Sequence, residues 1–287
     1  MASFVLGGFR RFRAAMRQSK ISKHLFDTAP PRADHRIAYG EDPLQFGDLR
    51  MPEGDGPHPV VVAIHGGFWR NRYSLEHLGF MCDAVTRAGY ATWSLEYRRI
   101  GDEGGGWPGT FLDIGMGVDY VRSLAPHYNL DLGRVTMIGH SAGGHMALWA
   151  AGRHKIPEDD PLYVPNPFRP KAAISLAGVT NLRMAWVQKL SSGVVLELIG
   201  GTPEDMPWRF RTASPIEMLP FGVRQVLIHG TEDENVPFSL SESYQKAASV
   251  AGDNVELIKL RGIGHFEVID PQMREWSEVL EAVRRET

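Results

Sequence analysis

The chain has 287 residues, 43% of them hydrophobic and 23% charged, with a formal net charge of −3. These are ordinary values for a globular protein, and 31 glycines with 19 prolines are too few for a collagen-like or low-complexity chain. A chain of this length can bury one large core. The slight negative charge argues against nucleic acid as a partner, and no run of about 18 apolar residues is present to span a membrane.

The N-terminal part differs from the rest in charge. Residues 1–36 contain eight Lys and Arg but only two acids, whereas the remainder is acidic. Apolar residues occur at near-helical spacing, with arginines among them: Phe4, Val5, Phe9, Phe12 and Met16. This pattern predicts a basic helical segment over residues 1–34 that docks on the body of the protein. An oligomer contact, as in a homodimer, and a membrane-surface helix are the alternatives.

The order of residues in this segment bears on localisation. Its short apolar stretch precedes the arginines, whereas a secretory signal places the positive charge first. The single cysteine, Cys82, cannot form an intrachain disulfide and lies in a helical pattern, so we expect a buried structural thiol. Both features predict a cytoplasmic protein.

From residue 35 onward, strand and helix patterns alternate. Apolar runs predict eight strands, the first two forming a hairpin, at 36–39, 44–51, 59–64, 90–95, 134–138, 172–176, 225–228 and 255–260. Helical patterns lie between them near 75–88, 110–125, 142–153, 239–251 and 271–285. This alternation predicts an α/β protein with a mainly parallel sheet over residues 35–287.

Two stretches interrupt the alternation. Residues 155–170 carry five prolines and read as a loop. Residues 179–220 are long for a connection inside a compact domain, and such insertions are often lids or binding loops. We expect this second stretch to begin with a helix over 182–198 and to form a small cap at the rim of the sheet.

The strongest local signal for chemistry is Gly139-His140-Ser141-Ala142-Gly143. It follows an apolar strand and opens a helical run, which is the setting of a nucleophile elbow. There the serine sits on a sharp turn, and the helix N-terminus faces charge that develops on the substrate. The neighbouring His140 and His145 are poor candidates for the base, because the elbow turns their side chains away from the serine.

A second motif supplies hydrogen-bond donors. His65-Gly66-Gly67-Phe68-Trp69 ends the most apolar strand, and its glycines allow backbone N–H groups to approach a bound carbonyl. Such donors stabilise the negatively charged tetrahedral intermediate of acyl transfer. We therefore expect the oxyanion hole to use the backbone N–H groups of Gly67, Phe68 and Ala142.

The acid and the base come from two later loops. The strand at 225–228 is followed by a loop in which Glu232, Asp233 and Glu234 compete as the acid. The last strand leads to a loop in which Gly262 and Gly264 precede His265, which can approach the serine. The order of serine, acid and histidine along the chain is that of the α/β-hydrolase fold.

Together these motifs resemble the α/β-hydrolase superfamily, and specifically its esterases with an HGG-type oxyanion loop. The loop at 65–69 is similar to the HGG(F/Y)W loop of bacterial kynurenine formamidase-like enzymes, and the elbow, acid loop and Gly264-His265-Phe266 also resemble theirs. The resemblance selects Asp233 as the acid, giving the triad Ser141, Asp233 and His265. It implies a mostly parallel eight-stranded sheet flanked by helices, and it requires neither a metal nor a cofactor.

The resulting hypothesis is that the protein is a serine carboxylesterase, which hydrolyses small or aryl esters through an acyl-enzyme. An arylformamidase that cleaves N-formylkynurenine is the closest alternative, and a non-catalytic binding member of the fold is a further one. Aromatic and apolar residues of the strand-end loops and the insertion are expected to contact the ester or amide substrate. They are Trp69, Trp107, Val179, Leu182 and Trp186.

Overall fold

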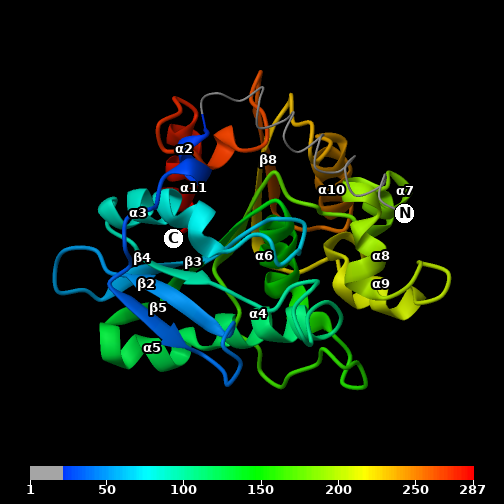
Figure 1. The fold of residues 1–287 in the computed structure, drawn as a ribbon, viewed down its shortest axis with the longest axis horizontal. Helices are drawn as coiled ribbons and strands as arrows, with labels where there is room; N and C mark the ends of the chain where they lie inside the picture. Colours follow the sequence, from blue (N-terminus) through cyan, green and yellow to red (C-terminus); the bar gives the residue numbers. More distant parts are fainter. Residues whose placement is uncertain (1–21) are drawn as a thin grey trace.

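The structure is a computed structural model that describes residues 22–287. Its sheet has eight strands in the order β1-β2-β4-β3-β5-β6-β7-β8 (Figure 1). β2 runs antiparallel to both its neighbours, β1 and β4, and all other pairs are parallel. The strands are β1 His35–Ala38, β2 Phe46–Arg50, β3 His58–Ile64, β4 Ala91–Leu95, β5 Leu130–His140, β6 Ala172–Leu176, β7 Arg224–Gly230 and β8 Val255–Leu260. The predicted mainly parallel sheet, with its initial hairpin, is confirmed.

Helices cover both faces of the sheet because its central strands are apolar on both sides. In β3, Val60, Val62 and Ile64 face one core, whereas Val61 and Ala63 face the other. The first core contains α4 Gly109–Asp119, α5 Val121–Tyr128, α6 Ala142–Gly152 and α10 Ser239–Val250. The second contains α3 Gly79–Arg87, which follows the 3-10 turn η1 Leu75–Leu78, and α11 Trp276–Glu286. Figure 1 shows α3 and α5 on opposite sides of the sheet.

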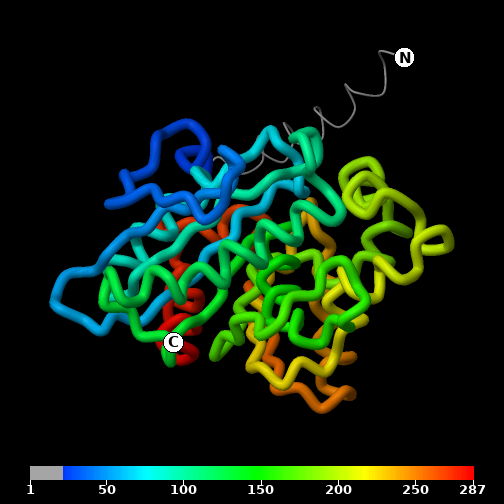
Figure 2. The backbone as a smooth tube through the Cα atoms, turned by 90° about the horizontal axis from the view of Figure 1, so that it is seen from below, coloured from blue at the N-terminus to red at the C-terminus, as the bar shows by residue number. Residues whose placement is uncertain are grey.

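The two stretches that interrupt the alternation behave differently. Between η2 Arg153–Lys155 and β6 the described chain is neither helix nor strand, as predicted. The insertion forms a helical lobe at one end of the molecule, seen at the right of Figure 2. Its elements are α7 Leu182–Val187, η3 Leu190–Ser192, α8 Val194–Ile199, α9 Pro207–Ala213 and η4 Pro215–Glu217. We call this lobe the cap.

The expectation of one continuous helix over 182–198 is wrong. Lys189, Ser191 and Ser192 adopt positive φ angles of 53°, 44° and 63°, which no right-handed helix accommodates. The chain therefore turns between α7 and α8. Asn181 starts α7 as its N-cap, accepting a hydrogen bond from the backbone N–H of Met184.

The described N-terminal residues form a short helix, α2 His24–Asp27, on the same side of the sheet as α3. The basic helix predicted from Phe4 to Met16 lies outside the described residues. Cys82 is buried in the second core, as expected, and burial raises the pKa of its thiol. In the described part of the chain, no helix is both long and apolar enough to cross a membrane.

Candidate active site

Ser141 stands at the turn between β5 and α6. Its backbone angles, φ 59° and ψ −118°, are those of a strained turn that a serine rarely adopts. The turn is held by the N–H of Ser141, which donates to the carbonyl of Leu176 at 2.8 Å. Ala142 is the first residue of α6, so its N–H has no acceptor within the helix. The serine hydroxyl and a donor group are thus placed side by side at the helix N-terminus.

Glycines allow the elbow and the loop after β3 to touch through their backbones. A Cβ atom on Gly143 would lie 1.9 Å from the carbonyl oxygen of Ile64, and one on Gly66 would lie 2.6 Å from that of His140. Both distances are shorter than any real contact, so no larger residue fits at either position. This close approach places the 65–69 loop directly beside Ser141.

In the 65–69 loop, three consecutive residues have positive φ angles, and hydrogen bonds fix the first residue, His65. Gly67, Phe68 and Trp69 have φ angles of 109°, 53° and 56°. Before them, the two ring nitrogens of His65 lie 2.8 Å from the carbonyl of Gly66 and 2.9 Å from Oε1 of Glu96. These contacts orient the loop before any substrate binds, which is what an oxyanion hole requires.

Asp233 and His265 form a short hydrogen bond. Nδ1 of His265 lies 2.6 Å from Oδ2 of Asp233, and the two side chains are 3% and 0% exposed. Oδ1 of Asp233 accepts two backbone N–H groups, from Asn235 and Val236, each at 2.8 Å. The carboxylate is therefore fixed by its own loop and faces the imidazole that the sequence predicted as its partner.

His229, a residue that the sequence reasoning did not single out, also contacts Asp233. Its Nε2 lies 3.1 Å from Oδ2 of Asp233 and 3.0 Å from the carbonyl of Val236, so this nitrogen carries the proton and donates. Its Nδ1 then accepts from the hydroxyl of Ser241 at 2.7 Å. The signal was present in the sequence, because His229 precedes the acid loop by one glycine, but only the fold shows what it touches.

The electrostatics favour an ionised acid and neutral neighbouring histidines. Burial alone would raise the pKa of Asp233, but attraction to His265 and hydrogen bonds from His229 and His265 lower it well below the usual range. Burial lowers the pKa of His145 to about 4 and that of His140 well below its ordinary value. Nε2 of each donates to a backbone carbonyl, that of Ala213 for His145 and that of His265 for His140. Both rings are thus committed to structural hydrogen bonds.

A small cavity joins the serine, the histidine and the 65–69 loop. It contains four of the predicted site residues, Ser141, His265, Gly67 and Phe68. Its other walls come from Phe26, Tyr73 and His77, which the sequence reasoning missed, and from His140 and Phe266, which belong to the predicted motifs but were not expected to line it. No residue of the cap lines it. Phe26 and Tyr73 belong to segments without a recognisable motif, so only their position in the fold reveals them.

The predicted substrate-contacting residues lie elsewhere. Val179 and Leu182 are fully buried in the first core, and Trp69 packs edge-on against His145 with 1% of its surface exposed. Trp107 is half-buried and packs against Trp208 of the cap, their ring centres 5.6 Å apart. Trp186 is half-buried against the core. None of the five lines the cavity at Ser141.

The cap makes polar contacts with the end of the 65–69 loop and with Trp107. Arg70, directly after Trp69, makes a two-pronged ion pair with Glu197 of α8, with N–O distances of 2.6 and 3.0 Å. The N–H of Trp107 donates to the carbonyl of Leu198 at 2.8 Å. The cap is therefore attached to Arg70, at the end of the 65–69 loop that lines the cavity, and to Trp107, which does not line it.

Solved structures with the same architecture include esterases. Esterase B from Lactobacillus rhamnosis superposes with a TM-score of 0.77 and 21% identity, covering 97% of this chain and 94% of that one. A truncated carbohydrate esterase from gut microbiota superposes with a TM-score of 0.76 and 22% identity, covering 90% of this chain and 99% of the other. At this identity the likeness establishes the α/β-hydrolase fold.

Sequence comparisons give the family. Esterase LipC of Mycobacterium tuberculosis is 27% identical over 252 residues, and the isoprenylcysteine alpha-carbonyl methylesterase ICME of Arabidopsis thaliana is 25% identical over 247 residues. The alignments cover 82% and 81% of this chain but only 60% and 56% of those proteins. The BD-FAE family model matches residues 48–247, well over half of the chain, from β2 to α10. The chain belongs to the BD-FAE family.

Proposed function

We propose that the protein hydrolyses carboxylic esters through an acyl-enzyme on Ser141. The observation that carries this proposal is the 2.6 Å contact between His265 and Asp233, made at a cavity that His265 shares with Ser141. The names of the relatives and of the superposed structures, all esterases or methylesterases, support the same activity.

The residues divide the reaction among them. Because Nδ1–H of His265 is donated to Asp233, the other ring nitrogen, Nε2, is left to accept the Ser141 proton as Oγ attacks the acyl carbon. Asp233 stabilises the imidazolium that forms. The backbone N–H groups of Gly67, Phe68 and Ala142 hold the oxyanion. His265 then protonates the leaving alcohol, and a water molecule repeats the sequence to release the acid.

The substrate is a small ester, or an amide cleaved by the same route. A cytoplasmic location and a homodimer stay predictions from the sequence.

The arylformamidase alternative uses the same triad, so it is distinguished by its substrate and not by the geometry of the site. A non-catalytic protein would differ from both enzymes in showing no turnover that depends on Ser141.

The test compares turnover of p-nitrophenyl acetate and of N-formylkynurenine by the wild-type protein and by Ser141→Ala. We expect higher kcat/KM on the ester and loss of both activities in the variant. A higher kcat/KM on N-formylkynurenine would identify an arylformamidase instead. Equal rates in the wild type and the variant would place the chemistry elsewhere or nowhere in the protein.

A further inference from the structure

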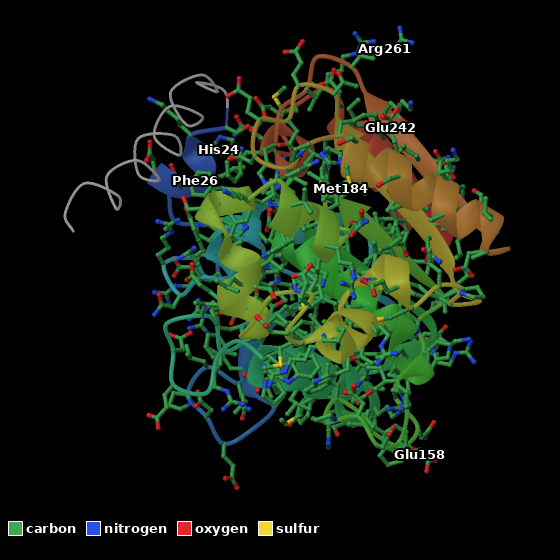
Figure 3. All side chains as sticks on the ribbon, turned by 90° about the vertical axis from the view of Figure 1, so that its right-hand side faces the viewer. His24, Phe26, Glu158, Met184, Glu242 and Arg261 are labelled. Atoms are coloured by element: carbon green, nitrogen blue, oxygen red, sulfur yellow. The ribbon has the colours of Figure 1, made fainter. Side chains whose placement is uncertain are left out.

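The short helix α2 is fastened to the loop that carries His265. Ser22 donates its hydroxyl to Oδ2 of Asp270 at 2.8 Å, and Nε2 of His24 lies 3.3 Å from Oδ1 of the same carboxylate. Leu25 is buried in the second core. Figure 3 labels His24 and Phe26 on this segment. Since Asp270 follows His265 by only five positions, α2 is anchored next to the proposed base.

This anchoring places one side chain against the proposed catalytic residues. The ring of Phe26 packs edge-on against Phe266 at 5.0 Å and stacks over His77 at 6.1 Å. Phe26 also lines the cavity that contains Ser141 and His265. A wall of that cavity is therefore contributed by a segment more than 100 residues before the serine in the chain.

The cavity is small, and a larger groove lies beyond Phe26. The space open to the centre of a water-sized sphere is about 10 Å³, which is roughly what one water molecule needs. By the same measure the neighbouring groove, between residues 25–30 and 72–77, measures about 330 Å³. Phe26, Tyr73 and His77 line both spaces, so they form the partition between them.

A space of this size suits the acyl group better than the alcohol. The alcohol must leave while the acyl-enzyme persists, so it requires an open path to solvent. The acyl group stays bonded to Ser141 until water attacks. A methyl group is similar in size to a water molecule, whereas each further methylene must displace part of the wall. One methylene changes kcat/KM by about 10- to 200-fold in hydrophobic pockets.

We propose that Phe26 is a specificity-determining residue that restricts the acyl group to about the size of acetyl by separating the cavity at Ser141 from the groove. This inference rests on the proposed ester hydrolysis and adds the substrate class, short-chain acyl esters. In this arrangement the N-terminal segment, and not the cap, sets the length of the acyl chain.

The test is a matched set of p-nitrophenyl esters, acetate, butyrate and octanoate, with wild type, Phe26→Ala and Phe26→Leu. We expect the wild-type kcat/KM to fall at least about tenfold from acetate to butyrate. Phe26→Ala should raise the butyrate-to-acetate ratio by about tenfold or more, because it joins the cavity to the groove. Phe26→Leu removes less volume, so its butyrate-to-acetate ratio should lie between those of the wild type and Phe26→Ala. It also tests the inference if the alanine variant folds poorly.

Two controls keep the outcomes distinct. Phe46→Ala, on β2 next to the edge strand β1, should leave the ratio unchanged. A second series that varies the alcohol at constant acetyl, ethyl acetate against phenyl acetate, should give the same ratio in Phe26→Ala as in the wild type. An unchanged acyl ratio in both Phe26 variants, or a change in the alcohol series alone, overturns the inference. Wild-type protein without any esterase turnover would instead reject the proposed function.

Discussion

His229 and His265 donate to the same oxygen of Asp233, from 3.1 and 2.6 Å. The carboxylate thus accepts hydrogen bonds from two imidazoles. Because His229 is fully buried and accepts from Ser241 through its other nitrogen, its orientation is fixed. We therefore expect His229 to position Asp233, the proposed acid.

Replacing this second donor should slow the chemical step. We expect His229→Leu to lower kcat by about 10- to 100-fold, since a hydrogen bond to a charged group contributes about 1.5–3 kcal/mol. KM should change little, because His229 does not line the cavity. His229→Gln retains an N–H donor and should recover part of the rate. An unchanged kcat in His229→Leu, measured on p-nitrophenyl acetate, would remove the residue from the mechanism.

Asp233 should matter far more than its acidic neighbours. Asp233→Asn is expected to lower kcat by about 10⁴ with the fold preserved, because the amide favours the wrong tautomer of His265. Glu232→Gln is the matched control, since Glu232 is exposed one position earlier in the same loop. Steady-state kinetics measure kcat, and far-ultraviolet circular dichroism shows whether the fold is preserved. Loss of activity in Glu232→Gln with near-normal activity in Asp233→Asn would transfer the acid role to the glutamate.

Gly66 should be intolerant of any side chain. A Cβ atom there would meet the carbonyl of His140 at 2.6 Å and Cβ of Ser141 at 2.9 Å, so Gly66→Ala must push the oxyanion loop away from the elbow. Loss of an oxyanion donor elsewhere costs about 10²–10³ in kcat, and we expect a fall of this order. Gly133→Ala, in an exposed stretch of β5, is the control and should keep normal kcat. Retained activity in Gly66→Ala would mean that this loop does not hold the oxyanion.

Acid should destabilise the fold through His145. Its pKa is lowered to about 4 by burial, whereas an unfolded histidine has a pKa of about 6.5. Between these values the unfolded chain binds more protons at this position than the folded chain, so stability rises with pH. The contribution of neutral His145 to the free energy of unfolding is complete above about pH 6.5, and it is lost as the pH falls toward 4. At pH 5 this one residue should cost about 2 kcal/mol relative to pH 7.5.

Urea unfolding at pH 5 and 7.5 measures this effect. His145→Gln keeps an N–H donor for the carbonyl of Ala213 but does not titrate, so the difference between the two pH values should shrink. His127→Gln changes an exposed histidine and should leave the difference as in the wild type. Equal pH dependence in all three proteins would contradict the assignment.

The sequence predicted the sheet because each central strand is apolar on both faces, as in 59–64, and because glycines mark the turns at strand ends. The same local signals located Ser141, Asp233 and His265 at those turns. Phe26 escaped prediction because its partners, Phe266 and His77, are distant in sequence and belong to different elements. The break after α7 has one signal in the sequence, Gly193 with φ 84°, but Lys189, Ser191 and Ser192, which also have positive φ, are not residues that favour it. Val179 and Leu182 show the converse, because their apolar character suits a core as well as a pocket.

Covalent labelling at Ser141 tests the central claim most directly. The protein is treated with a fluorophosphonate, digested, and the modified residue is located by tandem mass spectrometry. We predict a single stoichiometric adduct on Ser141, absent from Ser141→Ala and retained in Ser277→Ala, which changes an exposed serine on α11. An adduct on another residue, or labelling that persists in Ser141→Ala, would contradict a mechanism based on this serine.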